Sequence, residues 1–203
     1  EKRYKFLQYI VARANKGGNV TIEPHGQENI PKEGGFMLFP NHQGLYDVLA
    51  IVDVCPRPLS AVIKKEAAGV PFLKQCVAIM KAFSIDREDI RQSMQVISNV
   101  TKEVQSGRNY IIFAEGTRSK MGNKLLNFKG GSFKAATKAK CPIVPVALID
   151  SFKPFDTSSI EPVTVQVHFL KPMLYDEYKD MKTVEIAAEV KHRIEETIEK
   201  YEK

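Results

Sequence analysis

The sequence predicts a single α/β domain with a mostly parallel or mixed central sheet flanked by helices. Three observations support this class. The chain has 203 residues, which is about the size of one domain. Hydrophobic residues make up 43% and charged residues 27% of it, close to the average of globular proteins. Apolar stretches of strand length alternate with amphipathic stretches of helix length, an order typical of sheets covered by helices.

The predicted elements follow one another along the chain with no repeat or flexible linker between them. Strands are predicted at Val20–Glu23, Phe36–Phe39, Leu59–Ile63, Ala78–Ile85, Asn109–Ala114, Ile143–Ile149 and Val163–Leu170. Helices are predicted at Asp47–Val54, Lys65–Gln75, Glu88–Ser106, Ser132–Lys140 and Thr183–Lys200. In α/β folds, ligands bind where loops leave the carboxyl ends of strands. We therefore expect the functional residues in the loops after Phe39, Ile85 and Ala114.

The first 18 residues are predicted to form an N-terminal amphipathic helix, and residues 19–203 the main domain. The segment Glu1–Lys16 mixes apolar and basic side chains, namely Tyr4, Phe6, Leu7, Ile10 and Val11 with Lys2, Arg3, Lys5, Arg13 and Lys16. This mixture suits a helix lying on an anionic membrane surface, and it suits packing on the domain core equally well. The sequence leaves both open.

No apolar run approaches the roughly 20 residues that span a bilayer, and no secretion signal is visible. We expect the protein at the cytoplasmic side of a membrane, held peripherally or anchored through a missing N-terminal segment. Three cysteines, Cys55, Cys76 and Cys141, are too few and too scattered for a disulfide framework or a Cys-x-x-Cys metal site. A reducing compartment fits best, and we expect no metal.

The formal net charge of +6 favours an anionic partner, which could be nucleic acid, a lipid headgroup or a phosphorylated substrate. Neither a nucleic-acid-binding motif nor an alternation of aromatic and basic residues is present. We therefore expect a membrane surface or a phosphorylated substrate rather than nucleic acid.

The loop after Phe39 contains a histidine followed five residues later by a carboxylate, His42 and Asp47. An aspartate that accepts from one imidazole nitrogen fixes the tautomer and makes the other nitrogen a better base, as activation of an alcohol requires. The alternative is that His42 is an ordinary loop residue and Asp47 only caps the following helix. This motif alone does not decide between them.

The loop after Ile85 offers Arg87, whose planar guanidinium could bind two phosphate oxygens. An ion pair with Asp86, Glu88 or Asp89 is the preferred explanation of this arginine when the loop is taken alone. The third of the three loops reads Ala114-Glu115-Gly116-Thr117-Arg118-Ser119. Gly116 would let the backbone turn beside a ligand, while Thr117 and Arg118 offer donors for a phosphate. Glu115 would accept from a substrate hydroxyl or brace Arg118; a plain turn is the alternative.

Two further segments could contribute to the same site. Lys129 precedes the Gly130-Gly131-Ser132 start of a helix, where an anion is favoured, although simple capping of that helix is the preferred explanation. Pro145 lies within the apolar strand Ile143–Ile149 and could form an apolar wall for substrate or pack in the core.

Taken in order, four segments resemble the motif blocks of the glycerolipid acyltransferase superfamily, and most closely its 1-acylglycerol-3-phosphate acyltransferase branch. They read Asn41-His42-Gln43-Gly44-Leu45-Tyr46-Asp47, Phe83-Ser84-Ile85-Asp86-Arg87, Phe113-Ala114-Glu115-Gly116-Thr117-Arg118-Ser119 and Ile143-Val144-Pro145-Val146-Ala147. Gly44 departs from the pattern, because many members have serine or threonine there. The order and spacing of four blocks make this resemblance much more specific than any one block.

The resemblance implies a glycerolphosphate acyltransferase-like fold with His42 as general base and Asp47 as its orienting partner. It implies that Arg87, Glu115, Gly116 and Arg118 surround the phosphate and glycerol of the acceptor, with Pro145 in the apolar wall. Asn41 before the histidine favours lysophosphatidate over glycerol 3-phosphate as acceptor.

The implied reaction moves a fatty acyl group from an acyl thioester, acyl-CoA or acyl carrier protein, to the free hydroxyl of 1-acylglycerol 3-phosphate. The product is phosphatidic acid, and no cofactor is required. The sequence contains no Gly-x-Ser-x-Gly elbow and no cysteine beside the dyad, so we expect direct transfer without an acyl-enzyme. Alternatives are acylation of glycerol 3-phosphate or another lysophospholipid, or a catalytically silent membrane-binding module.

Overall fold

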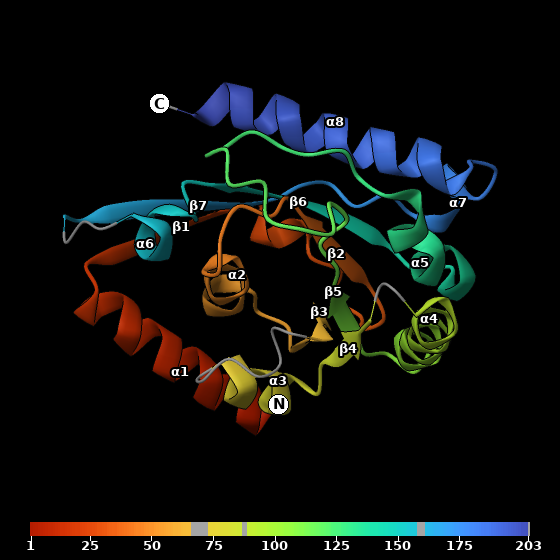
Figure 1. Ribbon diagram of the computed structural model, residues 1–203, viewed down its shortest axis with the longest axis horizontal. Coiled ribbons are helices and arrows are strands. Elements are labelled where there is room, and N and C mark those ends of the chain that lie inside the picture. Colours follow the sequence, from red (N-terminus) through yellow and green to blue (C-terminus); the bar gives the residue numbers. More distant parts are fainter. Residues whose placement is uncertain (66–72, 87–88, 158–160, 203) are drawn as a thin grey trace.

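The structure, a computed structural model, describes residues 1–65, 73–86, 89–157 and 161–202 (Figure 1). The strands in these ranges are β1 (Val20–His25), β2 (Met37–Pro40), β3 (Leu59–Lys64), β4 (Phe83–Ile85), β5 (Asn109–Ile111), β6 (Ile143–Ile149) and β7 (Val163–Phe169). The helices are α1 (Lys2–Gly17), α2 (Asp47–Val54), α3 (Leu73–Met80), α4 (Ile90–Gln105), α5 (Lys134–Ala139), α6 (Lys153–Asp156), α7 (Tyr175–Tyr178) and α8 (Thr183–Tyr201), with 3₁₀ turns η1 (Gln27–Asn29) and η3 (Gly130–Phe133).

The strands form one mixed sheet in the order β1-β7-β6-β2-β5-β3-β4. The five strands β6, β2, β5, β3 and β4 are adjacent in the sheet and run parallel to one another. Strand β7 runs antiparallel to β6, and β1 runs parallel to β7. The predicted α/β class with a mostly parallel sheet is confirmed. Strand β2 lies at the centre of the seven-stranded sheet, between β5 and β6. The loops that follow these three strands therefore leave the same edge of the sheet side by side.

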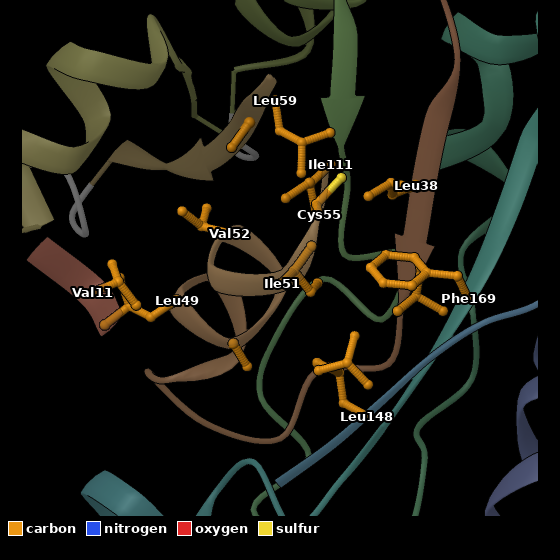
Figure 2. Close-up of a cluster of buried hydrophobic side chains, with 14 of the residues drawn as sticks. Val11, Leu38, Leu49, Ile51, Val52, Cys55, Leu59, Ile111, Leu148 and Phe169 are labelled. Carbon is orange, nitrogen blue, oxygen red and sulfur yellow. The ribbon is translucent and has the colours of Figure 1, made fainter. Parts of the chain in front are cut away.

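Helices cover both faces of the sheet, as Figure 1 shows, with α1, α2 and α3 on one side and α4, α5 and α8 on the other. All residues of β2 and β6 are buried, as expected for strands covered on both faces. Figure 2 shows part of the core under α2, where Leu49 and Ile51 of the helix and Leu38 and Leu148 of the sheet gather. This packing fixes the start of α2 against the ends of the central strands.

Helix α4 illustrates why the sequence forms these elements. Its buried residues include Val96, Val100 and Val104, spaced four apart on one face. Asp89 precedes the helix, and its carboxylate accepts a hydrogen bond of 3.0 Å from the backbone N–H of Gln92. An apolar stripe and a capped first turn together specify an amphipathic helix against the sheet.

Several predicted elements differ from the observed ones. The predicted strand Ala78–Ile85 is wrong in its first part, because α3 runs to Met80 and only Phe83–Ile85 is a strand. Short apolar runs fit a helix as well as a strand, which explains the error. Most of the predicted helix Lys65–Gln75 lies outside the described residues. The predicted strand Asn109–Ala114 ends at Ile111.

Helix α1 packs on α2 and α3 through one apolar face. Tyr4, Leu7 and Val11 are buried in the same core as α2. The side-chain amide of Gln8 adds a hydrogen bond of 2.9 Å to the carbonyl of Val52. The segment predicted as an N-terminal helix thus packs on the core, while Phe6 remains 59% exposed. Membrane contact through this exposed face stays a prediction. No helix in the described ranges has the length and apolarity to cross a bilayer.

Candidate active site

The structure brings His42 and Asp47 into direct contact at the carboxyl end of β2. The Nδ1 atom of His42 lies 2.7 Å from Oδ2 of Asp47. Asp47 is fully buried, whereas the side chain of His42 is 21% exposed. The second ring nitrogen, Nε2, has no hydrogen-bond partner among the described residues. The imidazole therefore has one nitrogen held by a carboxylate and the other available to a substrate hydroxyl.

Asp47 does not act as a simple helix cap. It is the first residue of α2, and its carboxylate points back to the preceding loop. Oδ2 accepts a hydrogen bond of 2.7 Å from the backbone N–H of Gln43, and both carboxylate oxygens lie 3.1 Å from the backbone nitrogen of Gly44. These bonds fold the loop around the carboxylate and fix His42 beside it. They also occupy two N–H groups that could otherwise have stabilised an oxyanion.

The loop after β5 supports His42 from the other side. The ring of Phe113 stacks on the imidazole with centroids 4.0 Å apart, and the backbone N–H of Ser119 donates a hydrogen bond of 2.8 Å to the carbonyl of His42. Gly116 adopts a positive φ of 80°, a conformation that favours glycine. The first and third predicted motifs are therefore neighbours in space.

Glu115 is buried and binds the backbone rather than Arg118. One carboxylate oxygen accepts a hydrogen bond of 2.6 Å from the N–H of His42, and the other accepts one of 2.8 Å from the N–H of Leu126. Burial raises the pKa of the Glu115 carboxyl, although these two hydrogen bonds oppose the shift. The structure thus shows Glu115 holding two loops together, and its predicted contact with substrate stays a prediction.

Asn41 similarly holds the site to β6. Its side chain donates a hydrogen bond of 3.0 Å to the carbonyl of Leu148 and accepts one of 2.7 Å from the N–H of the same residue. Asn41 is 1% exposed. The side chain thereby closes the end of β2 against the end of β6. Because Asn41 is buried, its side chain offers almost no surface to a substrate, and its predicted role in substrate binding stays a prediction.

Arg118 lies next to the dyad loop and forms an ion pair across it. Its guanidinium Nη1 is 3.6 Å from Oδ1 of Asp156 in α6, and both side chains are about one third exposed. Such a pair contributes little stability, so a stronger anion could replace the carboxylate. Thr117 beside it is exposed to solvent. Both residues are placed where a phosphate could reach them.

Lys129 and Pro145, two further predicted residues, also lie in the described ranges. Lys129 has an exposed side chain, and its backbone N–H bonds to Ala114. Pro145 is buried within β6, paired with Phe39 of β2, which corresponds to the core-packing alternative. Arg87 lies outside the described residues. Strand β4, which precedes it, is three strands from β2, about 14 Å across the sheet at about 4.8 Å per strand.

Sequence reasoning missed Gln43 and Ser151. The hydroxyl of Ser151 lies 2.5 Å from Oδ1 of Asp47, and its backbone N–H donates a hydrogen bond of 2.9 Å to the side-chain carbonyl of Gln43. The amide group of Gln43 in turn bonds to Asn123 and to the carbonyl of Leu148. Ser151 belongs to no motif with a fixed spacing, so only the fold reveals it.

The two buried cysteines, Cys55 and Cys141, are poor candidates for a nucleophile. Burial raises the pKa of the Cys55 and Cys141 thiols to about 12, which disfavours their nucleophilic thiolate forms. Among the described residues, no group of three or more His, Cys, Asp or Glu side chains could hold a metal ion. The His42 and Asp47 pair is thus the arrangement in the described part of the chain best suited to activate a hydroxyl.

Comparisons with known proteins identify the family of the chain. Residues 21–149 match the acyltransferase family. The chain is 32% identical over 138 residues to the 1-acyl-sn-glycerol-3-phosphate acyltransferase of Helicobacter pylori, covering 66% of this chain and 58% of that protein. It is 30% identical over 171 residues to the enzyme of the same name from Salmonella typhimurium, covering 84% of this chain and 69% of that protein. The chain therefore spans only part of each relative.

A solved structure has the same fold over nearly the whole chain. The crystal structure of the 1-acyl-sn-glycerophosphate (LPA) acyltransferase from Thermotoga maritima superposes with a TM-score of 0.81. The match covers 98% of this chain and 80% of that one, at 21% sequence identity. At this identity the similarity establishes the fold alone.

Proposed function

The chain belongs to the acyltransferase family, and we propose that it transfers a fatty acyl group from an acyl thioester to the free hydroxyl of 1-acylglycerol 3-phosphate, giving phosphatidic acid. The observation that supports this most is the 2.7 Å contact between His42 and the buried Asp47. The names of the relatives support the choice of acceptor. The thioester is already activated, so we propose a reaction without a cofactor.

The geometry supports a direct transfer. His42 accepts the proton of the acceptor hydroxyl at Nε2 while Asp47 holds the Nδ1–H, and the hydroxyl oxygen bonds to the thioester carbonyl carbon. The tetrahedral oxyanion then collapses, the carbon–sulfur bond breaks, and the imidazolium returns the proton to the leaving thiolate. The products are an ester and a free thiol. General-base help of this kind contributes about 10²- to 10⁴-fold, and positioning must supply the rest.

Arg118 is the proposed anchor for the acceptor phosphate. Its loop is joined to His42 by the hydrogen bond from Ser119, and its present partner, Asp156, is a carboxylate about one third exposed. A phosphate carries more negative charge and matches the guanidinium with two oxygens. Thr117 and the backbone at Gly116 would add donors. We propose Arg87 as a second contact of the phosphate on the basis of its sequence motif alone.

The acceptor carries an acyl chain, so we also propose that the protein works at the cytoplasmic surface of a membrane. The exposed side of α1 supports this proposal. Phe6 and Tyr9 are each 59% exposed, and Lys2, Arg3, Lys5 and Arg13 share the helix with them. Replacing Phe6 and Tyr9 by serine should weaken binding to vesicles that contain phosphatidylglycerol. Val184→Ser, which changes a 62% exposed residue of α8, is the control; equal binding by all three proteins would contradict the proposal.

One experiment tests the function and identifies the donor. The purified chain is incubated with lysophosphatidate or glycerol 3-phosphate, each with acyl-CoA or acyl carrier protein, and the lipid products are identified by mass spectrometry. We expect phosphatidic acid from lysophosphatidate, and none when His42 is replaced by alanine. Product from glycerol 3-phosphate alone would support the other acceptor. Absence of product from all four combinations, with binding to vesicles retained, would support a silent membrane-binding module.

A further inference from the structure

We propose that Ser151 is a positioning residue for the reaction, which aligns Asp47 and through it the base His42. This inference rests on the proposed function. The Ser151 hydroxyl lies 2.5 Å from Oδ1 of Asp47, while Nδ1 of His42 lies 2.7 Å from Oδ2. The two oxygens of one buried carboxylate thus face two different side chains. Ser151 itself is fully buried and cannot contact substrate.

The direction of the Ser151 hydrogen bond follows from its surroundings. The hydroxyl oxygen is also 3.0 Å from the side-chain oxygen of Gln43, so its single proton could go to either acceptor. That Gln43 oxygen already accepts from the backbone N–H of Ser151 at 2.9 Å. The carboxylate is closer and negatively charged, so it takes the proton. Gln43 therefore holds Ser151 through the backbone N–H of Ser151, and the Ser151 hydroxyl donates its proton to Asp47.

The turn after β6 holds Ser151 in this place. Asp150 adopts a left-handed φ of 63°, which is uncommon for a residue other than glycine. Asn123 stabilises the turn, because its side-chain oxygen accepts a hydrogen bond of 2.8 Å from the N–H of Asp150 and its amide donates one of 3.1 Å to the Asp150 carboxylate. Such a backbone persists only where its neighbours determine it. The fold thus directs the Ser151 side chain inward, to Asp47.

Without Ser151, the Oδ1 atom of Asp47 would keep only the N–H of Gly44 at 3.1 Å. Oδ2 would keep its bonds to the N–H groups of Gln43 and Gly44, but the carboxylate would be freer to rotate about its bond to Cβ and would hold His42 less precisely. Its charge would also be shared with fewer donors, so it would attract the imidazolium proton more strongly. Loss of the Ser151 hydroxyl should therefore reduce turnover and make the base harder to deprotonate.

The test compares Ser151→Ala and Ser151→Cys with the control Ser60→Ala, which removes a buried hydroxyl of β3. We expect kcat of Ser151→Ala to fall about 10- to 100-fold, as for loss of a hydrogen bond to a charged group, with little change in KM for either substrate. The midpoint of the acid limb of the kcat/KM profile should move to higher pH. Cysteine fills the space but donates weakly, so Ser151→Cys should resemble Ser151→Ala. Ser60→Ala should keep wild-type kcat.

A double-mutant cycle with Asp47→Asn separates positioning from packing. If Ser151 acts through Asp47, adding Ser151→Ala to Asp47→Asn should change kcat by less than about twofold. An unshifted pH profile, full recovery in Ser151→Cys, or the same loss with and without Asp47 would overturn the proposal. If Ser151→Ala does not fold, the kcat and pH profile of Ser151→Cys test the proposal in its place. These outcomes require an active wild-type protein, whereas failure of the proposed function would appear as no acyl transfer by the wild type.

Discussion

The carboxylate of Glu115 accepts a hydrogen bond of 2.6 Å from the backbone N–H of His42, a residue 73 positions away in the chain. The same carboxylate also binds the N–H of Leu126. The peptide that positions the His42 imidazole is thus held by the loop that carries Arg118. Two motifs that are separate in the sequence form one rigid unit.

Replacing Glu115 by glutamine should lower kcat by about tenfold or more with a smaller effect on KM. Both partners of Glu115 are N–H donors, and an amide offers an oxygen to only one of them. Because burial raises the pKa of Glu115, protonation of its carboxyl as the pH falls should produce the same defect in the wild type. Steady-state kinetics from pH 8 to pH 5 measure this. A glutamine variant with wild-type kcat would exclude a supporting role for the charge.

Replacing His42 by alanine should abolish nearly all turnover, because no other described side chain can take the hydroxyl proton. Asp47→Ala should leave slight activity, since the imidazole remains but its tautomer is no longer set; Asp47→Asn should be as poor. Rapid quenching with labelled acyl donor and no acceptor should trap no acyl group on the protein; a labelled protein would contradict direct transfer.

Replacing Arg118 by alanine should raise KM for lysophosphatidate about 10- to 100-fold and leave KM for the donor nearly unchanged. This factor corresponds to loss of a charge-assisted hydrogen bond worth about 1.5 to 3 kcal/mol. Arg108→Ala is a matched control, because Arg108 pairs with Glu103 away from the dyad. Similar kinetics for both variants would remove Arg118 from the acceptor site.

Gly44 should tolerate no side chain while Asp156 is present. A Cβ atom at Gly44 would lie 2.6 Å from Oδ2 of Asp156 and 3.0 Å from Cα of Phe152. We expect Gly44→Ala to lower stability by about 1 to 3 kcal/mol, as overpacking does, and the added change Asp156→Ala to recover part of this loss. Urea unfolding of the wild type, Gly44→Ala, Asp156→Ala and the double variant measures the loss of stability and its recovery. Additive losses would show that the two positions are independent.

The buried histidine His168 should make the protein less stable below pH 6.5. Burial, and then the neighbouring His25, lower the pKa of His168 to about 4, whereas an unfolded histidine has a pKa of about 6.5. Between these values the unfolded chain binds a proton that the folded chain does not, so stability falls as pH decreases from 6.5 to 4. His168→Gln should flatten this part of the thermal stability profile. His192→Gln, which alters an exposed histidine, should leave it unchanged.

The sequence predicted the parts of the structure that local patterns determine. Helix α2 and strand β6 have the predicted bounds, because an apolar helix beginning at Asp47 and a continuous apolar strand are both strong local signals. The pairing of His42 with Asp47 follows from their spacing at the start of that helix. The direction of β7 was not predictable, since an isolated strand carries no sign of which way it runs in a sheet.

The supporting residues of the site were mostly beyond sequence reasoning. Glu115 and Asn41 lie beside the His42 and Asp47 pair, but their bonds to backbone groups depend on how separate loops meet, and their predicted contacts with substrate stay predictions. Ser151 lies between Asp150 and Phe152 in no recognisable motif, and its proposed role rests on the contact with Asp47 that the fold creates. Hydrogen bonds between distant loops are set by tertiary structure, which leaves no periodic trace in the chain.

The pairing of β1 with β7 constrains the order in which the protein can fold. Val20 and Val163 are partners, so among the described strands β1 pairs with β7, which lies more than 130 residues later in the sequence. Closing such a long loop is entropically costly and slows folding. During synthesis on a ribosome, β1 must wait with an unpaired edge until β7 emerges, although α1 and α2 can already meet. The N-terminal strand is therefore the segment in which newly made chains are most exposed to mispairing with one another.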